Sequence, residues 1–259
     1  MTTESDTQRP SQRGGVVRTV LLFCFLPGWT VLWGLTAMLA GWIRNDWLFR
    51  LSLGSWSRGI LFVSGIRLAV TRAPELTNAA CVFVANHQSA LDIPILSTAC
   101  LMTHDVRFMA KESLFKIPFL GWGISGNGFI PIKRESPRHA ANTIKEIVAK
   151  NSSAYSYVLF AEGTRSPDGR MQDFKRGAIA MVLRMGRPLA PVSIIDACRA
   201  NPKGRWIVRP GTVRVMFHAP VIVPAFDGDD RALRETITAQ VQKAVEEALP
   251  EEQRRAAAV

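Results

Sequence analysis

In this 259-residue chain, a short apolar run is followed by a histidine and an aspartate that are close enough in sequence to act together in proton transfer. Residues 80–85 are expected to form a buried strand, and Asn86-His87-Gln88-Ser89-Ala90-Leu91-Asp92 follows it. The Asp92 carboxylate can hold one ring nitrogen of His87 while the other takes a proton from a hydroxyl. The unperturbed histidine pKa of about 6.5 leaves much of the ring basic near neutral pH. The pair is therefore a candidate general base. The alternative is that His87 and Asp92 only lie at the surface or cap a helix.

A second segment, residues 160–166 (FAEGTRS), also follows an apolar strand-like run. Gly163 lets the backbone approach a ligand closely, and Arg165 offers a planar fork of donors that suits phosphate. The alternative is a surface loop in which Glu162 and Arg165 pair with each other. Taken alone, the segment therefore predicts either an anion site or an ordinary loop.

A third segment extends from Lys111 to Arg134 and carries basic residues at both ends. It passes through an apolar stretch with Pro and Gly and closes with a predicted strand that ends at Lys133 and Arg134. A helix-turn-strand connection with solvated basic ends is the alternative interpretation.

In this order and spacing, the three segments resemble the signature blocks of the 1-acyl-glycerol-3-phosphate acyltransferase family, which makes phosphatidic acid. The N-H-x-x-x-x-D block is complete, and the F-P-E-G-T-R-S block departs only at Ala161, where the family has proline. A Val-Pro-Val-like strand appears at residues 190–194, so the resemblance covers roughly residues 80–195. The positions of the first two blocks that match are Asn86, His87, Asp92, Lys111, Leu114, Phe115, Pro118, Gly128, Ile130, Ile132 and Arg134.

Two departures from the family pattern stand out. Ala161 in place of proline removes a backbone constraint but no chemistry, so it should be tolerated. Pro131 and Lys133 stand where many relatives carry other residues, including an aspartate before the closing Arg134. The local field is therefore more positive, which leaves the acyl acceptor less defined.

The resemblance implies direct acyl transfer without a metal or organic cofactor. His87, oriented by Asp92, would deprotonate the sn-2 hydroxyl of 1-acyl-glycerol-3-phosphate (lysophosphatidic acid) as it attacks an acyl thioester of coenzyme A or acyl-carrier protein. The acceptor could instead be a lyso-ornithine lipid, another lysophospholipid or glycerol phosphate, and a non-catalytic basic membrane-binding protein is a further alternative. The residues expected to bind the acceptor and its phosphate are Lys111, Arg134, Glu162, Gly163, Thr164 and Arg165.

Composition favours a membrane partner over nucleic acid. The formal charge of +11 calls for an anionic partner. Aromatic residues are not interleaved with Lys and Arg as in single-strand binders, and no helix-turn-helix or zinc module is visible. The four cysteines are isolated, which is typical of reduced residues in a cytosolic setting: Cys24, Cys81, Cys100 and Cys198.

The N-terminal region strengthens the membrane interpretation. Residues 19–43 carry no charge and exceed the helix of about 20 residues that crosses a bilayer. Residues 48–70 are apolar but interrupted by three arginines, which favours an interfacial amphipathic helix. Two core helices of a soluble protein are the alternative. The resemblance implies a helical pair in the inner membrane, with the catalytic domain on the cytoplasmic face. Candidate interfacial anchors are Trp29, Trp33, Trp42 and Trp47.

Alternating strands and helices after Ile66 predict an α/β fold: one glycerolipid-acyltransferase-like domain with a mixed sheet flanked by helices. The expected division is a mobile N-terminus at 1–19, membrane-associated helices at 20–66, the catalytic domain at 67–249 and a mobile tail at 250–259. Helices are expected after Ser136-Pro137, around Ile179 to Met185, and after Asp229. Strands are expected at 67–71, 80–85, 106–110, 128–132, 155–161, 189–195 and 212–217.

Two apparent motifs are set aside. Residues 121–126 satisfy the letters G-x-G-x-x-G, but they neither follow a strand nor open a helix, so a dinucleotide site is not expected. No G-x-S-x-G elbow occurs, which argues against a covalent acyl-serine intermediate. Ser89 is therefore interpreted as a structural polar group.

Overall fold

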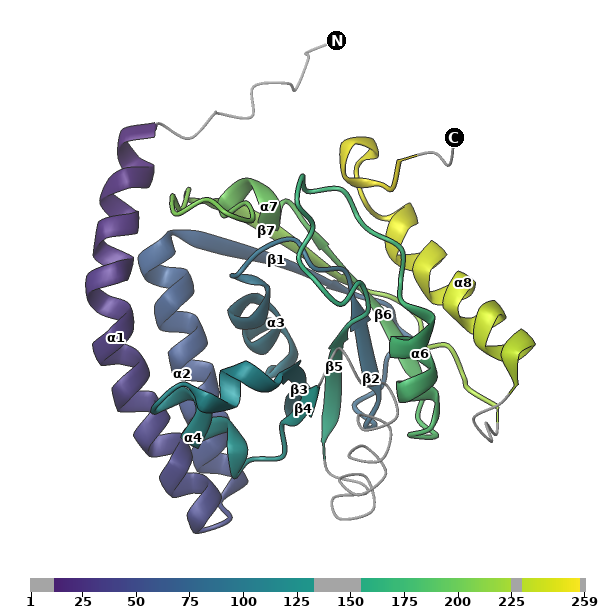
Figure 1. Cartoon of the computed structure of the whole chain (residues 1–259), viewed down its shortest axis with the longest axis horizontal. Coiled ribbons are helices and arrows are strands. Elements are labelled where there is room, and N and C mark those ends of the chain that lie inside the picture. Colours follow the sequence, from purple (N-terminus) through teal and green to yellow (C-terminus); the bar gives the residue numbers. More distant parts are fainter. Residues whose placement is uncertain (1–11, 133–154, 225–229, 257–259) are drawn as a thin grey trace.

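A seven-stranded mixed sheet forms the centre of the protein, whose computed structural model describes residues 12–132, 155–224 and 230–256. The strand order is β1-β7-β6-β2-β5-β3-β4, and all neighbours are parallel except β6 and β7. Figure 1 shows the sheet between two layers of helices. The strands are β1 (Ile66–Arg72), β2 (Val82–Ala85), β3 (Val106–Lys111), β4 (Ile130–Ile132), β5 (Ser156–Phe160), β6 (Leu189–Ile195) and β7 (Gly211–Phe217).

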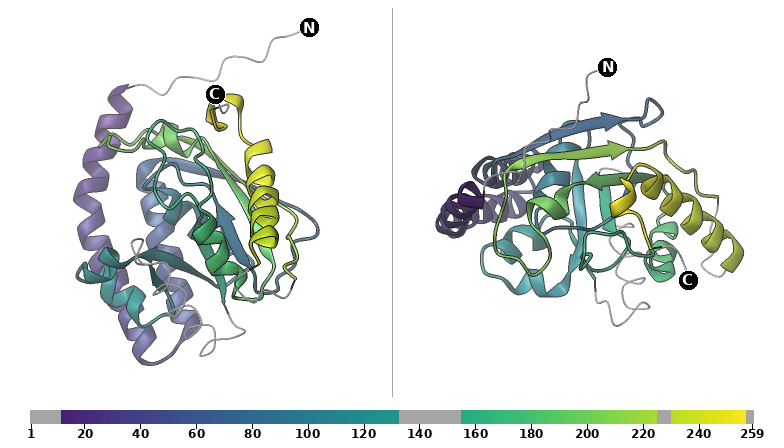
Figure 2. Two further views of the ribbon diagram at one scale, coloured as in Figure 1. Left: turned by 45° about the vertical axis from the view of Figure 1, so that its right-hand side comes forward. Right: turned by 90° about the horizontal axis from the view of Figure 1, so that it is seen from above.

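The central strand β2 contributes to both faces of the sheet because successive side chains of a strand point to opposite sides. Phe83 and Ala85 join the core beneath α1, α2 and α3, whereas Val82 and Val84 join the core beneath α6 and α8. Figure 2 shows the two helical layers from other directions. The helices are α1 (Gln12–Trp42), α2 (Asp46–Ser64), α3 (Asp92–Cys100), η1 (Glu112–Lys116), α4 (Leu120–Ser125), α6 (Arg176–Leu183), α7 (Ala197–Ala200), α8 (Arg231–Glu247) and η2 (Glu251–Gln253).

The predicted fold class is confirmed. All seven expected strands are present, and Leu189–Ile195 agrees at both ends. The strand expected from residue 128 begins later, because Gly128 has a φ of 79° and lies outside the extended region. Arg134 and the helix expected at Ser136-Pro137 lie outside the described residues.

Helices α1 and α2 form an antiparallel pair along one side of the sheet (Figure 1). Helix α1 continues through Pro27, and its segment Gly15–Trp42 is long and apolar enough to cross a bilayer, with only 17% of its most apolar window buried. Asn45 caps α2 by accepting a hydrogen bond from the Leu48 N–H at 2.9 Å. The apolar surface of α1 indicates membrane association.

The arginine-bearing segment 48–70 divides into a helix and a strand. Helix α2 ends where Gly65 adopts φ 70°, and Arg67 then lies in β1. Of the expected tryptophan anchors, Trp42 and Trp47 are 84% and 69% exposed. Trp29 instead packs inside the helix pair, where its indole N–H donates to the Trp56 carbonyl at 3.2 Å.

Parts of the two terminal segments that were expected to be mobile form helical turns. Helix α1 begins at Gln12 rather than near residue 20, and within it Thr19 Oγ accepts a hydrogen bond from the Val208 N–H at 2.8 Å. At the other end, Gln253 is 2% exposed and bonds to distant loops, so the turn Glu251–Gln253 is anchored to the domain through this side chain. These tertiary contacts lie far apart in the sequence, which is why local pattern did not predict the order.

The glycines of residues 121–126 serve close helix packing. Gly121 and Gly123 lie in the short helix α4, which packs against α1, and Gly126 is the C-cap of α4. A Cβ on Gly123 would lie 3.1 Å from the Gly34 carbonyl oxygen, and a Cβ on Gly34 would lie 2.6 Å from the Phe119 carbonyl oxygen. Small residues on both sides therefore let α4 approach the apolar helix.

Candidate active site

The sequence motifs meet where three neighbouring strands end. The His87 loop follows β2, the 161–166 loop follows β5, and a third loop follows β6. The chain leaves β2 through α3 toward β3 on one side, whereas β5 connects through α6 to β6 on the other. Ligands of open α/β sheets bind where the strand order reverses in this way, at the carboxyl ends of the strands.

Asn86 fixes the end of β2 to the neighbouring strand. Its side-chain amide donates to the Ile194 carbonyl at 2.9 Å, and its oxygen accepts from the Ile194 N–H at 2.8 Å. The pair of bonds continues the β2–β6 ladder through a buried side chain. The residue before His87 is therefore held to strand β6 at two points.

His87 and Asp92 are in direct contact, with 2.7 Å between Nδ1 and Oδ2. The same Oδ2 also accepts hydrogen bonds from the Gln88 and Ser89 N–H groups, at 2.7 and 2.8 Å. An oxygen that receives two backbone N–H donors acts as an acceptor toward Nδ1 as well, so the proton lies on Nδ1. Nε2 then carries a lone pair, and no hydrogen bond from the described residues reaches it.

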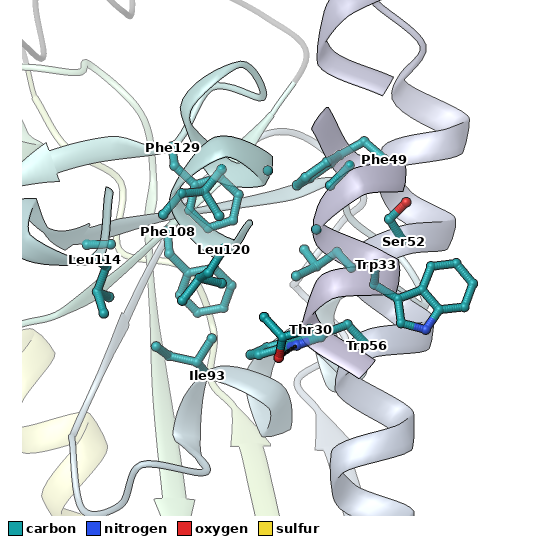
Figure 3. Close-up of a pocket in the computed structure, with 16 residues that line it drawn as sticks. Thr30, Trp33, Phe49, Ser52, Trp56, Ile93, Phe108, Leu114, Leu120 and Phe129 are labelled. Atoms are coloured by element: carbon teal, nitrogen blue, oxygen red, sulfur yellow. Dashed lines mark hydrogen bonds between the residues drawn. The ribbon is translucent and has the colours of Figure 1, made fainter. Parts of the chain in front are cut away.

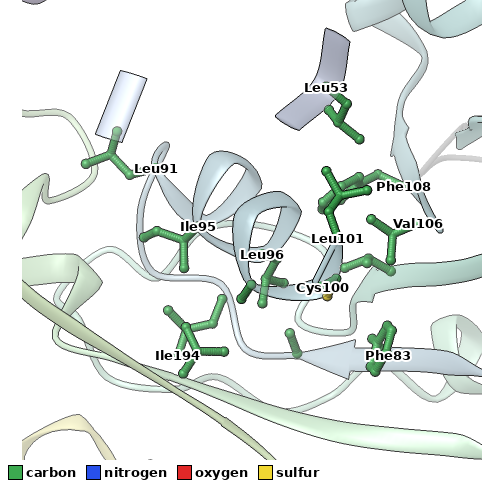
Figure 4. Packing of buried hydrophobic residues seen from close by; sticks show 14 of the residues in the cluster. Leu53, Phe83, Leu91, Ile95, Leu96, Cys100, Leu101, Val106, Phe108 and Ile194 are labelled. Carbon is green, nitrogen blue, oxygen red and sulfur yellow. The ribbon is translucent and has the colours of Figure 1, made fainter. Parts of the chain in front are cut away.

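Helix α3 holds the acid in place. Asp92 is its first residue and is fully buried, and the helix packs its apolar side onto the sheet through Ile95 and Leu96 (Figure 4). Ser89 Oγ accepts a hydrogen bond from the Leu91 N–H at 3.2 Å, which agrees with its structural interpretation. A carboxylate at a helix N-terminus is also stabilised by the helix dipole.

Phe160 is a component of the site that the sequence did not single out. Its ring stacks on the His87 imidazole at 4.1 Å with 16° between the planes. The His87 side chain is only 12% exposed. The stacked ring and the Asp92 bond together restrict the imidazole to one orientation.

Glu162 lies beneath the site, 1% exposed, and does not pair with Arg165 as the alternative interpretation proposed. Its two oxygens accept from the His87 N–H at 2.8 Å and the Gln172 N–H at 3.2 Å. Burial raises the pKa of its carboxyl to about 8, although both backbone hydrogen bonds act in the opposite direction. The geometry makes Glu162 a support of the His87 loop rather than a group open to a ligand.

The predicted phosphate-binding residues are distributed over neighbouring strand ends. Gly163, Thr164 and Arg165 are half-buried in the loop after β5, while Lys111 is exposed at the end of β3. Ser166 ties this loop to the first motif, because its N–H donates to the His87 carbonyl at 2.8 Å. Strand β5 lies between β2 and β3, so Lys111 is one strand further from His87 than Arg165.

A buried glutamine from the chain end also supports the first motif. Gln88 donates from its side-chain nitrogen to the Gly169 carbonyl and to Gln253 Oε1, both at 3.1 Å. Gln253 in turn donates to Asp196 Oδ1 at 2.7 Å. The sequence offered no signal for this contact, since the partners are 165 residues apart.

An apolar cavity opens beside the site, between the helix pair and the β3–β4 side of the sheet. Figure 3 shows Trp56 and Phe49 of the helices facing Phe108 and Ile93 across it, and Trp33 also borders the cavity. Ile93 directly follows Asp92, and Phe108 stacks on Phe160 at 6.3 Å. The cavity wall thus continues through aromatic contacts to His87. The remaining walls come from Thr30, Gly34, Ala37, Ser52, Leu53, Ala110, Leu114, Leu120, Gly123, Ile124 and Phe129.

Residues 67–195 match the family model described as Acyltransferase. With its histidine–aspartate pair at the end of a central strand, the chain belongs to the acyltransferase family.

Similar proteins agree with this family. A 1-acyl-sn-glycerol-3-phosphate acyltransferase from Pseudomonas aeruginosa is 29% identical over 78% of this chain and 79% of its own length. The crystal structure of the 1-acyl-sn-glycerophosphate acyltransferase from Thermotoga maritima has a TM-score of 0.74 and 25% identity, covering 91% of this chain and 96% of that one. A chloroplastic 1-acyl-sn-glycerol-3-phosphate acyltransferase from Brassica napus is 38% identical over 54% of this chain, which spans only 40% of that relative's length.

Proposed function

We propose that the protein transfers a fatty acyl group from an acyl thioester to the sn-2 hydroxyl of 1-acylglycerol-3-phosphate, forming phosphatidic acid. The observation that carries the proposal is the 2.7 Å contact between His87 and Asp92, which leaves Nε2 as a base. The names of the similar proteins support the choice of acceptor.

His87 is the general base of the proposed reaction. Its Nε2 takes the proton of the acceptor hydroxyl as that oxygen attacks the thioester carbonyl carbon. The carbon–sulfur bond then breaks, and the imidazolium returns the proton to the departing thiolate. Asp92 keeps the ring in the required tautomer and stabilises the imidazolium, and general-base assistance of this kind contributes about 10²–10⁴-fold.

Arg165 and Lys111 would bind the acceptor phosphate. Both cations lie on the β5–β3 side of His87, where each follows or ends a strand. Gly163 and Thr164 shape the same loop, and Arg134, outside the described residues, belongs to this group by the family resemblance. Guanidinium groups suit phosphate because they offer two parallel donors.

The apolar cavity would take the fatty acyl chain of the donor. Its walls are side chains of the helix pair and of the β3–β4 region, and Ile93 brings it next to the His87–Asp92 pair. A chain seated there leaves its carbonyl end at the imidazole. Because α1 and α2 form one wall, the acyl chain can enter from the bilayer without crossing water.

The proposed location is the inner membrane, with the sheet on the cytoplasmic face. The exposed apolar side of α1 supports membrane attachment, and the net charge of +11 favours an anionic leaflet. Acyl thioesters and reduced cysteines both belong to the cytoplasmic side; the described cysteines are free thiols.

The test is product analysis by mass spectrometry with the purified chain in lipid vesicles. Lysophosphatidic acid competes with lyso-ornithine lipid and other lysophospholipids, and the donors are acyl-coenzyme A and acyl-carrier protein. We expect phosphatidic acid as the main product. His87→Ala should abolish transfer while vesicle binding is retained.

Preferred acylation of another lysolipid would replace the acceptor in the proposal. Undiminished transfer by the alanine variant would remove His87 from the role of base. Vesicle binding by wild type with no transfer to any acceptor would favour the non-catalytic alternative.

A further inference from the structure

A second cleft borders the loops that follow β5 and β6, whereas the apolar cavity borders the helix pair and the β3–β4 side of the sheet. The second cleft is formed by the end of the 161–169 loop and by the long connection between α7 and β7. This connection follows β6, and β2 separates β6 from β5 and β3 in the sheet. The residues that line the cleft are Gln88, Pro167, Asp168, Gly169, Cys198, Arg199, Pro202, Lys203, Arg205, Ile207 and Arg209.

The cleft carries uncompensated positive charge. Within the described chain, no carboxylate lies in ion-pair reach of Lys203, Arg205 or Arg209. Arg199 is neutralised by Asp196 and Glu252, at 3.3 and 2.6 Å. One carboxylate, Asp168, opposes the three cations, and it already accepts from Ser166 Oγ and the Arg170 N–H. An anion with several phosphate oxygens would balance the remaining charge.

Two contacts attach the cleft to the catalytic loops. Lys203 Nζ donates to the Arg165 carbonyl at 2.8 Å and to Thr164 Oγ at 3.4 Å, which leaves one ammonium donor for a ligand. Gln88, adjacent to His87, lines the cleft, and its Oε1 is buried without a partner among the described residues. The side-chain nitrogen of Gln88 donates both of its hydrogen bonds to carbonyl-type oxygens. Its Oε1 can therefore accept a hydrogen bond from an N–H group of a ligand.

We propose that this basic cleft binds the phosphate-bearing pantetheine arm of the acyl donor. The proposal rests on the proposed function and assigns the second half of its donor site. A thioester donor is a linear molecule with an apolar chain at one end, amide N–H groups along its arm and phosphates at the other end. The protein offers an apolar cavity beside Ile93, a buried amide acceptor at Gln88 and, in the cleft that Gln88 lines, three cations without a carboxylate partner among the described residues.

The cleft also lies beside the membrane helix. Val208 of the same connection donates its N–H to Thr19 Oγ in α1 at 2.8 Å, and Trp206 packs on Phe23 at 5.6 Å. An acyl donor bound in this cleft would hold its phosphates against the cleft cations while its acyl chain extends toward the helix pair α1 and α2. The proposed acceptor cations Lys111 and Arg165 lie at the ends of β3 and β5, whereas Arg205 and Arg209 belong to the connection that follows β6.

The test uses the full chain in vesicles of neutral phospholipid and a double charge reversal, Arg205→Glu with Arg209→Glu, which spares the Lys203 contacts with the Thr164–Arg165 loop. Binding of coenzyme A is measured by equilibrium dialysis, independently of turnover. The KM values for acyl-coenzyme A, acyl-carrier protein and lysophosphatidic acid are measured separately. The matched control reverses two exposed cations of α8, Arg231→Glu with Lys243→Glu.

We expect the cleft variant to raise the donor KM by about tenfold or more for each lost charge-assisted contact, with the acceptor KM and vesicle binding unchanged. A rise for acyl-coenzyme A together with weaker coenzyme A binding identifies the free cofactor as the phosphate source. A rise for acyl-carrier protein alone supports the same cleft with the protein-borne arm.

Other results would overturn the assignment. These are unchanged KM values for both donors, a rise confined to lysophosphatidic acid, or an equal effect of the α8 control. If wild type makes no phosphatidic acid but binds coenzyme A with the expected dependence on Arg205 and Arg209, the proposed acceptor fails and the cleft stands. Failure of coenzyme A binding and of both donor effects in an active enzyme refutes only the cleft.

Discussion

The surroundings of His87 are dominated by hydrogen bonds, whereas the walls of the apolar cavity are dominated by hydrophobic side chains. At His87, backbone N–H groups, Asp92 and Glu162 fix atoms by hydrogen bonds of 2.7–2.8 Å. In the cavity wall, Ser52 and Trp56 direct their polar atoms to Thr36 and Thr30 within the helix pair, and the cavity itself is apolar. Directional bonds set the position of a reacting proton, whereas a hydrocarbon chain requires only space and an apolar surface.

The largest effect should come from the acid that orients the base. Asp92→Asn preserves size but removes the charge that stabilises the imidazolium, so kcat should fall by about 10²–10⁴-fold. Phosphatidic acid formation is measured with saturating substrates. Ser89→Ala, in the same loop, should retain activity, because Ser89 Oγ contacts only the Leu91 N–H among the described groups. An equal loss of kcat in both variants would show that the substitutions disturb the conformation of the loop, and it would not support the role of Asp92.

The lipid-facing side of α1 should respond strongly to charge. Leu35 is 41% exposed, and Leu35→Lys places an ammonium group on the apolar surface. A lysine at the centre of a membrane helix costs about 2.5–3.5 kcal/mol, so vesicle binding should weaken markedly. Co-sedimentation with vesicles measures it. Gln240→Lys on exposed α8 adds the same charge where water is the solvent, and it should have little effect. Similar losses in both variants would contradict the assignment of α1 as the membrane surface.

Filling the cavity should alter selectivity rather than chemistry. Ala110 lies on the cavity wall, and Ala110→Phe takes space from the end of a long acyl chain. The ratio of kcat/KM for long against short donors should fall about tenfold, since a methylene excluded from an apolar pocket is worth about 1–3 kcal/mol. Competition between donors of different length, read by product mass, measures this ratio. Ala232→Phe on α8 serves as the control, and an unchanged ratio in the Ala110 variant would place the acyl chain elsewhere.

The smallest effect concerns the buried carboxyl of Glu162. Its pKa is raised from about 4.5 when unfolded to about 8 when folded, mainly by burial. The folded state therefore holds a proton that the unfolded state has lost between these values, and the stability from this group declines as pH rises through that window. Glu162→Gln cannot titrate, so its stability relative to wild type should increase from pH 5 to pH 8. Thermal unfolding in detergent at both pH values measures it; a constant difference would contradict the raised pKa.

The local sequence pattern was sufficient to predict a feature where a residue's neighbours in sequence are also its neighbours in space. The strand at 189–195 and the contact of His87 with Asp92 depend on short-range geometry, so both were predicted. Local pattern failed where distant segments meet. Glu162 was expected at the substrate, but the fold turns it toward the His87 backbone.

The sequence by itself determined the α/β alternation, the apolar N-terminal helix and the order of the motif blocks, because periodicity and spacing encode them directly. Tertiary structure decided which sides of His87 carry the apolar cavity and the basic cleft. Those positions follow from the strand order, which joins β2 to both β5 and β6 and brings α1 beside the 202–209 connection. Pairing of distant strands is governed by packing of whole faces, and no window of neighbouring residues records it.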